Sequence, residues 1–165
     1  MTFKNQQIQL QAFFPDLETP LAEPLVGTVD EGVEFSLTAS EIDSDETSTP
    51  GYNIDLSDNS IVLETVEATV ENPLYQEGDF NGFIFSDVSN EIPAIEQVNI
   101  DRADTNLDVD AADVTFTEDT ISLNLEGTSY TPGEQLKLDV VFESTSDPVE
   151  SLANRCGNPP FLIFN

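Results

Sequence analysis

The chain has 165 residues, of which 33 are Asp or Glu and only 4 are Lys or Arg, so its formal net charge is −29. This charge excludes the basic patch that binding to nucleic acid or to an anionic membrane requires. The absence of His and the presence of a single Cys exclude His-dependent catalytic triads, imidazole metal sites and an intrachain disulfide. The length fits one domain that can bury its own core.

Hydrophobic residues alternate with polar ones at a period of two along most of the chain, which is typical of β-strands. Clusters of Gly, Pro, Asn and Asp separate the alternating runs. This pattern predicts an all-β fold, an antiparallel β-sandwich of jelly-roll or Ig-like type with almost no helix. One helical turn is expected, within residues 107–113. The nine predicted strands comprise residues 8–14, 33–37, 54–56, 61–66, 83–85, 98–100, 114–116, 121–125 and 136–142.

The order of these strands suggests how they are organised. Residues 1–68 and 80–142 are two strand-rich halves, which we expect to form one sheet each. The last two strands are expected to pair as a hairpin through Pro132 and Gly133, and Asn81-Gly82 is expected to form a tight turn or a bulge. The sandwich domain is predicted to span residues 1–143, and residues 144–165 form a Pro-rich tail with a terminal apolar strand.

Two acidic loops are candidates for binding calcium, which prefers six to eight oxygen ligands. Asp104-x-Asn106-x-Asp108 matches the start of an EF-type loop, but Val109 and Thr115 stand where that loop needs Gly and Glu. Calcium in a different geometry is one prediction, and a pair of solvated acidic loops is the alternative. The first candidate set is Asp101, Asp104, Asn106, Asp108, Asp110 and Asp113, and the second is Asp43, Asp45 and Glu46.

Aromatic residues give a further candidate site. Tyr52, Tyr75 and Tyr130 lie near predicted turns and could form a platform for a sugar ring, whereas the phenylalanines of the strands are expected in the core. A calcium-dependent carbohydrate-binding module is therefore an alternative function. A glycoside hydrolase with two carboxylates is a weaker one, because 33 acidic residues form close pairs by chance. No enzymatic activity is predicted.

The tail contains four consecutive apolar residues, Phe161, Leu162, Ile163 and Phe164, after a stretch with Pro148, Pro159 and Pro160. They could add an edge strand to a sheet of their own chain or pair with a neighbouring subunit. Pairing within the chain is favoured, since it costs no association entropy.

Three segments carry a resemblance: Phe13-Phe14-Pro15-Asp16, the run 80–87 that begins Phe-Asn-Gly-Phe, and the run 108–116 that leads into residues 121–127. Together they resemble a poorly characterised group of secreted or surface β-sandwich proteins of cyanobacteria and proteobacteria. Members tend to have Phe-Asn-Gly followed by aromatics, then an Asp-Ala-Ser-Arg-like turn before a Val-Thr-Phe strand. Asp113 stands here where that pattern often has Arg. The resemblance implies an extracellular setting and no catalytic motif.

These observations predict a non-enzymatic structural or surface-interaction protein that works by assembly in a layer, filament or particle. The expected partner is a second copy or another surface or particle protein, and the expected location is extracellular, at a cell surface or on a virion. The polar N-terminus lacks the apolar run of a secretory signal, and no segment has the roughly 20 apolar residues of a membrane span. No insertion into a membrane is therefore expected.

Overall fold

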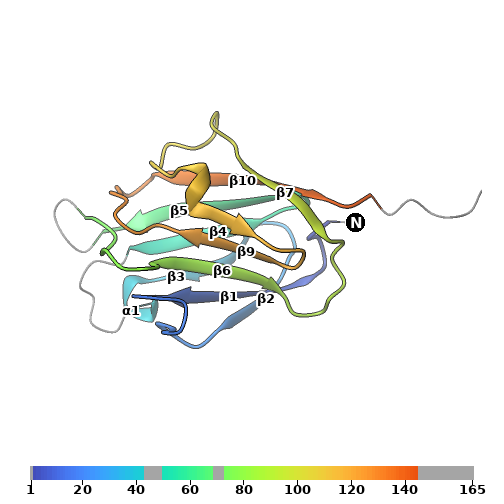
Figure 1. Ribbon diagram of the computed structural model, residues 1–165, viewed down its shortest axis with the longest axis horizontal. Helices are drawn as coiled ribbons and strands as arrows, with labels where there is room; N and C mark the ends of the chain where they lie inside the picture. Colours follow the sequence, from blue (N-terminus) through green and yellow to red (C-terminus); the bar gives the residue numbers. More distant parts are fainter. Residues whose placement is uncertain (1, 43–49, 69–72, 145–165) are drawn as a thin grey trace, which may run out of the picture.

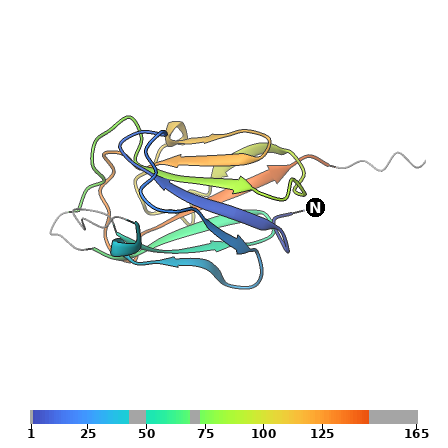
Figure 2. The same ribbon diagram turned by 90° about the horizontal axis from the view of Figure 1, so that it is seen from below.

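The structure, a computed structural model, describes residues 2–42, 50–68 and 73–144. The described chain forms ten β-strands in two antiparallel five-stranded sheets that face one another (Figures 1 and 2). The predicted all-β sandwich is therefore confirmed. Within these ranges the helices are α1 (Ala39–Ile42) and the 3-10 turn η1 (Ala111–Asp113), and neither has the length that a membrane crossing requires.

Each sheet combines strands from both halves of the chain. Sheet A has the order β2-β1-β6-β9-β8, and sheet B has the order β3-β4-β5-β10-β7. The prediction of one sheet per half is thus wrong. The strands are β1 (Gln7–Phe13), β2 (Leu25–Thr28), β3 (Val33–Leu37), β4 (Gly51–Leu56), β5 (Ser60–Glu67), β6 (Gly82–Asp87), β7 (Ile95–Ile100), β8 (Val114–Phe116), β9 (Thr120–Asn124) and β10 (Gln135–Phe142).

Alternation of side chains builds the core between the sheets. In β1, Ile8, Leu10 and Ala12 are buried while the residues between them are partly exposed. In β10, the buried positions again alternate, beginning with Leu136 and Leu138. Burying a side chain of this size contributes about 1.5–3 kcal/mol, so the inward faces of the strands supply the main driving force for folding.

Two local predictions do not agree with the structure. β9 and β10 do not form a hairpin, because the chain crosses from sheet A to sheet B between them. Asn81-Gly82 does not close a turn either, since Gly82 is the first residue of β6 and lies opposite Asn124 of β9. A Cβ atom at Gly82 would lie 1.9 Å from the carbonyl oxygen of Leu123, so the glycine allows two backbones to approach closely.

The two open sides of the sandwich differ. On one side, the edge strands β7 and β8 are joined by the loop 101–113, which buries Leu107 and Val109 in the core. The backbone N–H of Ile95 also donates to the carbonyl of Glu118 across this side, at 2.9 Å. On the other side, the edge strands β2 and β3 are connected by a short turn that contains Gly32 at φ +101°. This second side lacks a covering loop in the part of the chain that the structure describes.

Candidate functional site

The first half of the acidic loop 101–113 is held by a cation that the protein supplies itself. Nζ of Lys137, on β10, lies 2.8 Å from Oδ2 of Asp101 and 2.9 Å from Oδ2 of Asp104. The hydrogen bond from Lys137, with one from the N–H of Ala103, lowers the pKa of Asp101. The two carboxylates raise the pKa of Lys137 in return. Asn106 accepts a hydrogen bond from the N–H of Gln135 at 2.7 Å.

The second half of the loop is held by hydrogen bonds to backbone atoms. Nη1 of Arg102 donates to the carbonyl of Val109 at 2.7 Å, and Nη2 lies 3.9 Å from the exposed carboxylate of Asp110. Oδ2 of Asp113 accepts the N–H of Asp110 at 2.7 Å and caps η1. The acidic side chains of the loop therefore bind different partners: Asp101 and Asp104 bind Lys137, Asp110 lies near Arg102, and Asp113 caps η1.

These contacts do not bring the predicted calcium ligands into one group. In residues 2–42, 50–68 and 73–144, no three or more Asp or Glu side chains cluster in a way that could hold a metal ion. Calcium binding at this loop stays a prediction. The second candidate set, Asp43, Asp45 and Glu46, lies outside the described residues, and so does the apolar run Phe161–Phe164.

The three tyrosines do not form a surface platform, so this prediction of a sugar site is wrong. Tyr52, Tyr75 and Tyr130 are 1%, 3% and 2% exposed. The hydroxyl of Tyr52 donates a hydrogen bond to that of Tyr75, and the rings of Tyr75 and Tyr130 pack with centroids 4.8 Å apart. Tyr52 shares the inward face of β4 with Ile54 and Leu56, and this alternation was visible in the sequence.

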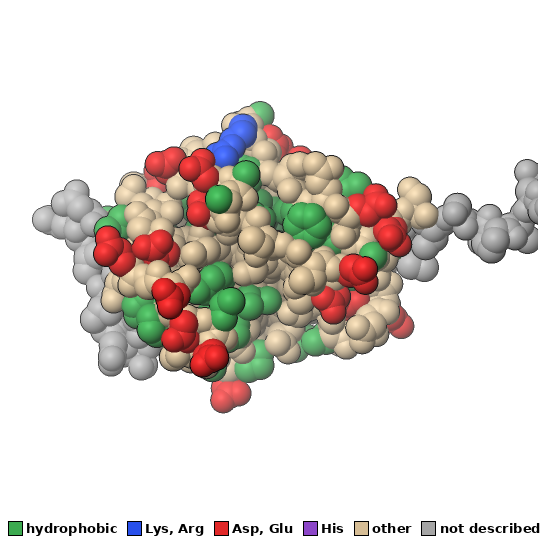
Figure 3. All heavy atoms as spheres, viewed as in Figure 1, with side chains coloured by type: hydrophobic (Ala, Val, Ile, Leu, Met, Phe, Trp, Pro, Cys, Tyr) green, Lys and Arg blue, Asp and Glu red, His purple; other side chains and the backbone are tan. Residues whose placement is uncertain are grey.

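On the side of the sandwich that no described loop covers, β2 is an edge strand. Leu25, Val26, Gly27 and Thr28 of β2 pair with β1 on one side, and no other described strand pairs with them. The four residues carry no charge, and Leu25 and Val26 are 42% and 55% exposed. Edge strands of soluble proteins usually carry charges, Pro or a covering segment that prevents pairing with another chain. In Figure 3, hydrophobic side chains gather in the region of β1, β2 and β6, with acidic side chains around them.

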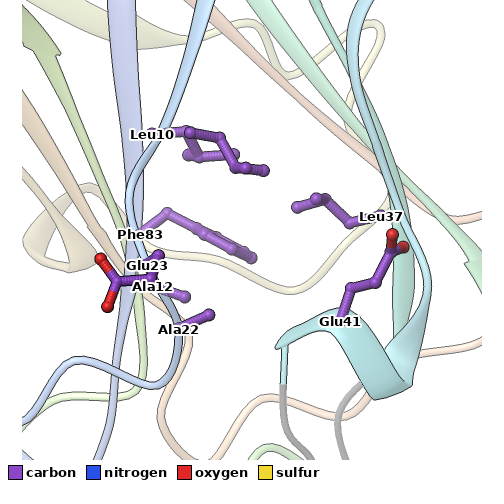
Figure 4. A pocket seen from close by; sticks show the side chains of 8 residues that line it. Leu10, Ala12, Ala22, Glu23, Leu37, Glu41 and Phe83 are labelled. Atoms are coloured by element: carbon purple, nitrogen blue, oxygen red, sulfur yellow. The ribbon is translucent and has the colours of Figure 1, made fainter.

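A cavity of about 260 Å³ opens beside this edge, between the two sheets. Figure 4 shows Leu10, Ala22 and Phe83 on one wall and Leu37 on the other, with open space between them. The remaining lining residues are Ala12, Glu23, Leu25 and Glu41. The cavity is thus apolar inside.

Two carboxylates accompany this apolar cavity. Glu41 accepts hydrogen bonds at 2.8 Å from the N–H and the hydroxyl of Thr38, which lower its pKa. Glu23 is exposed, and Figure 4 shows its carboxylate turned away from the cavity. We name the surface formed by β2 and this cavity the open edge. Sequence reasoning missed it, since residues 25–28 do not show the alternation by which the other strands were found.

Comparison of the chain with protein-family models, with curated proteins and with solved structures finds no match.

Proposed function

We propose that the protein is a non-enzymatic structural subunit that acts by self-association in an extracellular or surface assembly. The observation that carries this proposal is the open edge: an uncharged, exposed edge strand beside an apolar cavity. A chain with a net charge of −29 has acidic residues available to protect an edge, yet β2 has none. Such an edge is a template for pairing with another chain.

The charge of the protein supports the same proposal. Association through broad surface contact would bring many carboxylates together and cost free energy. Backbone pairing at β2 with burial of a few apolar side chains avoids most of this cost, since it uses a small surface and the strand itself has no acidic residue. The resemblance to secreted and surface β-sandwich proteins supports the extracellular setting.

The molar mass of the full chain, measured by multi-angle light scattering over a range of concentrations, tests the proposal. We expect a mass above that of the monomer that rises with protein concentration and with salt, because salt screens the repulsion between subunits. A mass that stays at the monomer value at every concentration and salt level would contradict self-association.

A further inference from the structure

We propose that the open edge is the acceptor for residues Phe161–Phe164 of a second copy, which add a strand to β2 and place an aromatic side chain in the cavity. This inference rests on the proposed self-association and names the two surfaces that meet. Backbone pairing with an edge strand, with side chains seated in an adjoining pocket, is a recurring mode of recognition between chains.

The size and chemistry of the cavity fit this occupant. Its volume is about 260 Å³, whereas cavities of about 150 Å³ with similar apolar linings already bind benzene. The side chains of Phe161 and Phe164 each end in a phenyl ring, which has the size of benzene. In an extended segment, residues 161 and 163 point to one face and residues 162 and 164 to the other. One phenylalanine can therefore enter the cavity while the backbone pairs with β2.

Charge favours the same occupant over any other part of a second copy. Residues 151–165 contain Arg155 and no Asp or Glu, so the side chains of this stretch carry a formal charge of +1 in a chain whose side chains sum to −29. Glu41 lines the cavity, and Glu23 lies beside it with its carboxylate turned away from the open space (Figure 4). The stretch is therefore attracted to the open edge, while the acidic body of a second copy is repelled.

The cavity of the open edge and the end of β10, from which the tail continues, lie at opposite ends of the sandwich. β10 runs antiparallel to β5, with Asp139 opposite Ser60, so Phe142 lies at the end of sheet B where β3 begins at Val33. Leu37, which lines the cavity, is at the other end of β3. Figure 1 shows this separation, with the end of β10 on the right and α1 on the left.

This arrangement favours a second copy over the chain's own tail. Residues 145–160 span about 50 Å when extended, which is enough to return to the cavity but only by passing back along the whole sandwich. A second copy placed end to end presents its cavity directly to the tail. Because donor and acceptor are different surfaces, the contact is heterologous, and repeated copies form an open head-to-tail chain or a ring.

Complementation between two variants tests the proposal. Deletion of residues 159–165 removes the donor, and Leu25→Asp blocks the acceptor with a charge at a position that is 42% exposed. We expect each variant alone to be monomeric. We expect an equal mixture to form a dimer of twice the monomer mass and nothing larger, because it contains one free tail and one free cavity. Mass is measured by light scattering in reducing buffer, which keeps Cys156 from linking chains.

Two further variants serve as controls. Leu74→Asp makes the same substitution at a leucine that is 45% exposed and outside the open edge, and it should associate like the unaltered chain. Ala22→Phe fills the cavity from the β1–β2 connection without adding a charge, so it replaces Leu25→Asp if that variant fails to fold.

The outcomes separate this inference from the proposed function. A mixture that stays monomeric while the unaltered chain associates overturns the donor and acceptor assignment and leaves self-association intact. A deletion variant that remains monomeric but melts at a lower temperature than an equally monomeric unaltered chain assigns the tail to its own sandwich. In that case both proposals fail.

Discussion

Three tyrosine hydroxyl groups are buried at one end of the core. Burial raises the pKa of Tyr52 and of Tyr75 well above the ordinary value near 10, and it raises the pKa of Tyr130 to about 12. In the unfolded chain these groups ionise near pH 10, while in the folded chain they stay protonated. The folded state then binds more protons, so the free energy of unfolding falls as pH rises above about 10.

We therefore expect the protein to lose stability between about pH 10 and pH 12. The urea midpoint should be lower near pH 11 than near pH 8. During an alkaline titration, the absorbance of tyrosinate should rise together with the loss of the strand signal in circular dichroism. Ionisation of the tyrosines near pH 10 with the strand signal intact would show that the three hydroxyl groups are accessible, contrary to the structure.

A second prediction concerns the contact of Lys137 with Asp101 and Asp104. Lys137→Met keeps the length of the side chain but leaves two carboxylates without their cation, so we expect a lower melting temperature at neutral pH. The pKa of Asp101 is lowered in the folded state, so its contribution is present above its unfolded pKa, near 4, and is lost as pH falls through the folded value. The difference between variant and unaltered protein should therefore shrink below about pH 4.

Lys4→Met is the matched control for this prediction, because it removes one positive charge from the same chain. No ion pair holds the Lys4 side chain in the described part of the structure. Thermal melts of both variants over the same pH range separate the local contact from the change in net charge. Equal melting temperatures for the two variants at neutral pH would show that the Lys137 contact adds nothing specific.

For single residues, the sequence carries information on which side chains are buried but not on which distant residues contact one another. The alternation of Tyr52, Ile54 and Leu56 indicates that Tyr52 points inward. The position of Tyr52 beside Pro50-Gly51, a predicted turn, instead suggested an exposed side chain. The pairing of Lys137 with Asp101 was not available, since 36 residues separate them and only the packing of β10 beside β7 brings them together.

Among the strands, the close contact between β6 and β9 gives a sharp test. Gly82→Ala places a methyl group against the backbone carbonyl of Leu123, which cannot move without shifting β9. We expect a loss of about 2–4 kcal/mol in the free energy of unfolding, as for other substitutions that strain the backbone of a core. Urea unfolding followed by circular dichroism measures this loss.

Gly27→Ala is the control, since this glycine also lies in a strand of sheet A. Its new methyl group would lie 3.0 Å from the ring edge of Phe35, a side chain that can shift. We expect a loss of about 1 kcal/mol, at the low end of the cost of overpacking, because the side chain can give way. Similar losses for the two variants would indicate that β6 and β9 are not in the close register described.

Sequence periodicity predicts where most strands lie, but it does not predict edge strands or strand order. Each of the nine predicted runs overlaps a strand, because most strands have an inward face that must be apolar. β2 was missed, since it lies at an edge and its residues are exposed or half-buried without alternation. The strand order was also missed, because the period of two shows which side chains face inward and not which strands pair.

For the whole molecule, a net charge of −29 opposes compaction. The described cations do little to offset it, since Lys137 and Arg102 serve the loop 101–113 and Lys4 has no ion pair there. The remaining carboxylates repel one another through solvent. Salt reduces this repulsion, because the screening length falls from about 30 Å at 0.01 M to about 8 Å at 0.15 M. We therefore expect the melting temperature to rise with sodium chloride over this range, and an unchanged value would contradict the prediction.

Calcium tests whether binding adds to this screening. An ion that binds only the folded state raises stability by mass action, so a calcium site would give a higher melting temperature than sodium at the same ionic strength. Asp101 and Asp104 are engaged by Lys137, which leaves Asp108 and Asp110 as the exposed acids of the loop. If the loop binds calcium as the sequence predicts, the double variant Asp108→Ala with Asp110→Ala should lose the calcium-specific rise and keep the rise with sodium. If the calcium-specific rise in melting temperature persists in the double variant, the calcium site lies elsewhere. If calcium and sodium raise the melting temperature of the unaltered protein equally at the same ionic strength, calcium acts by screening alone.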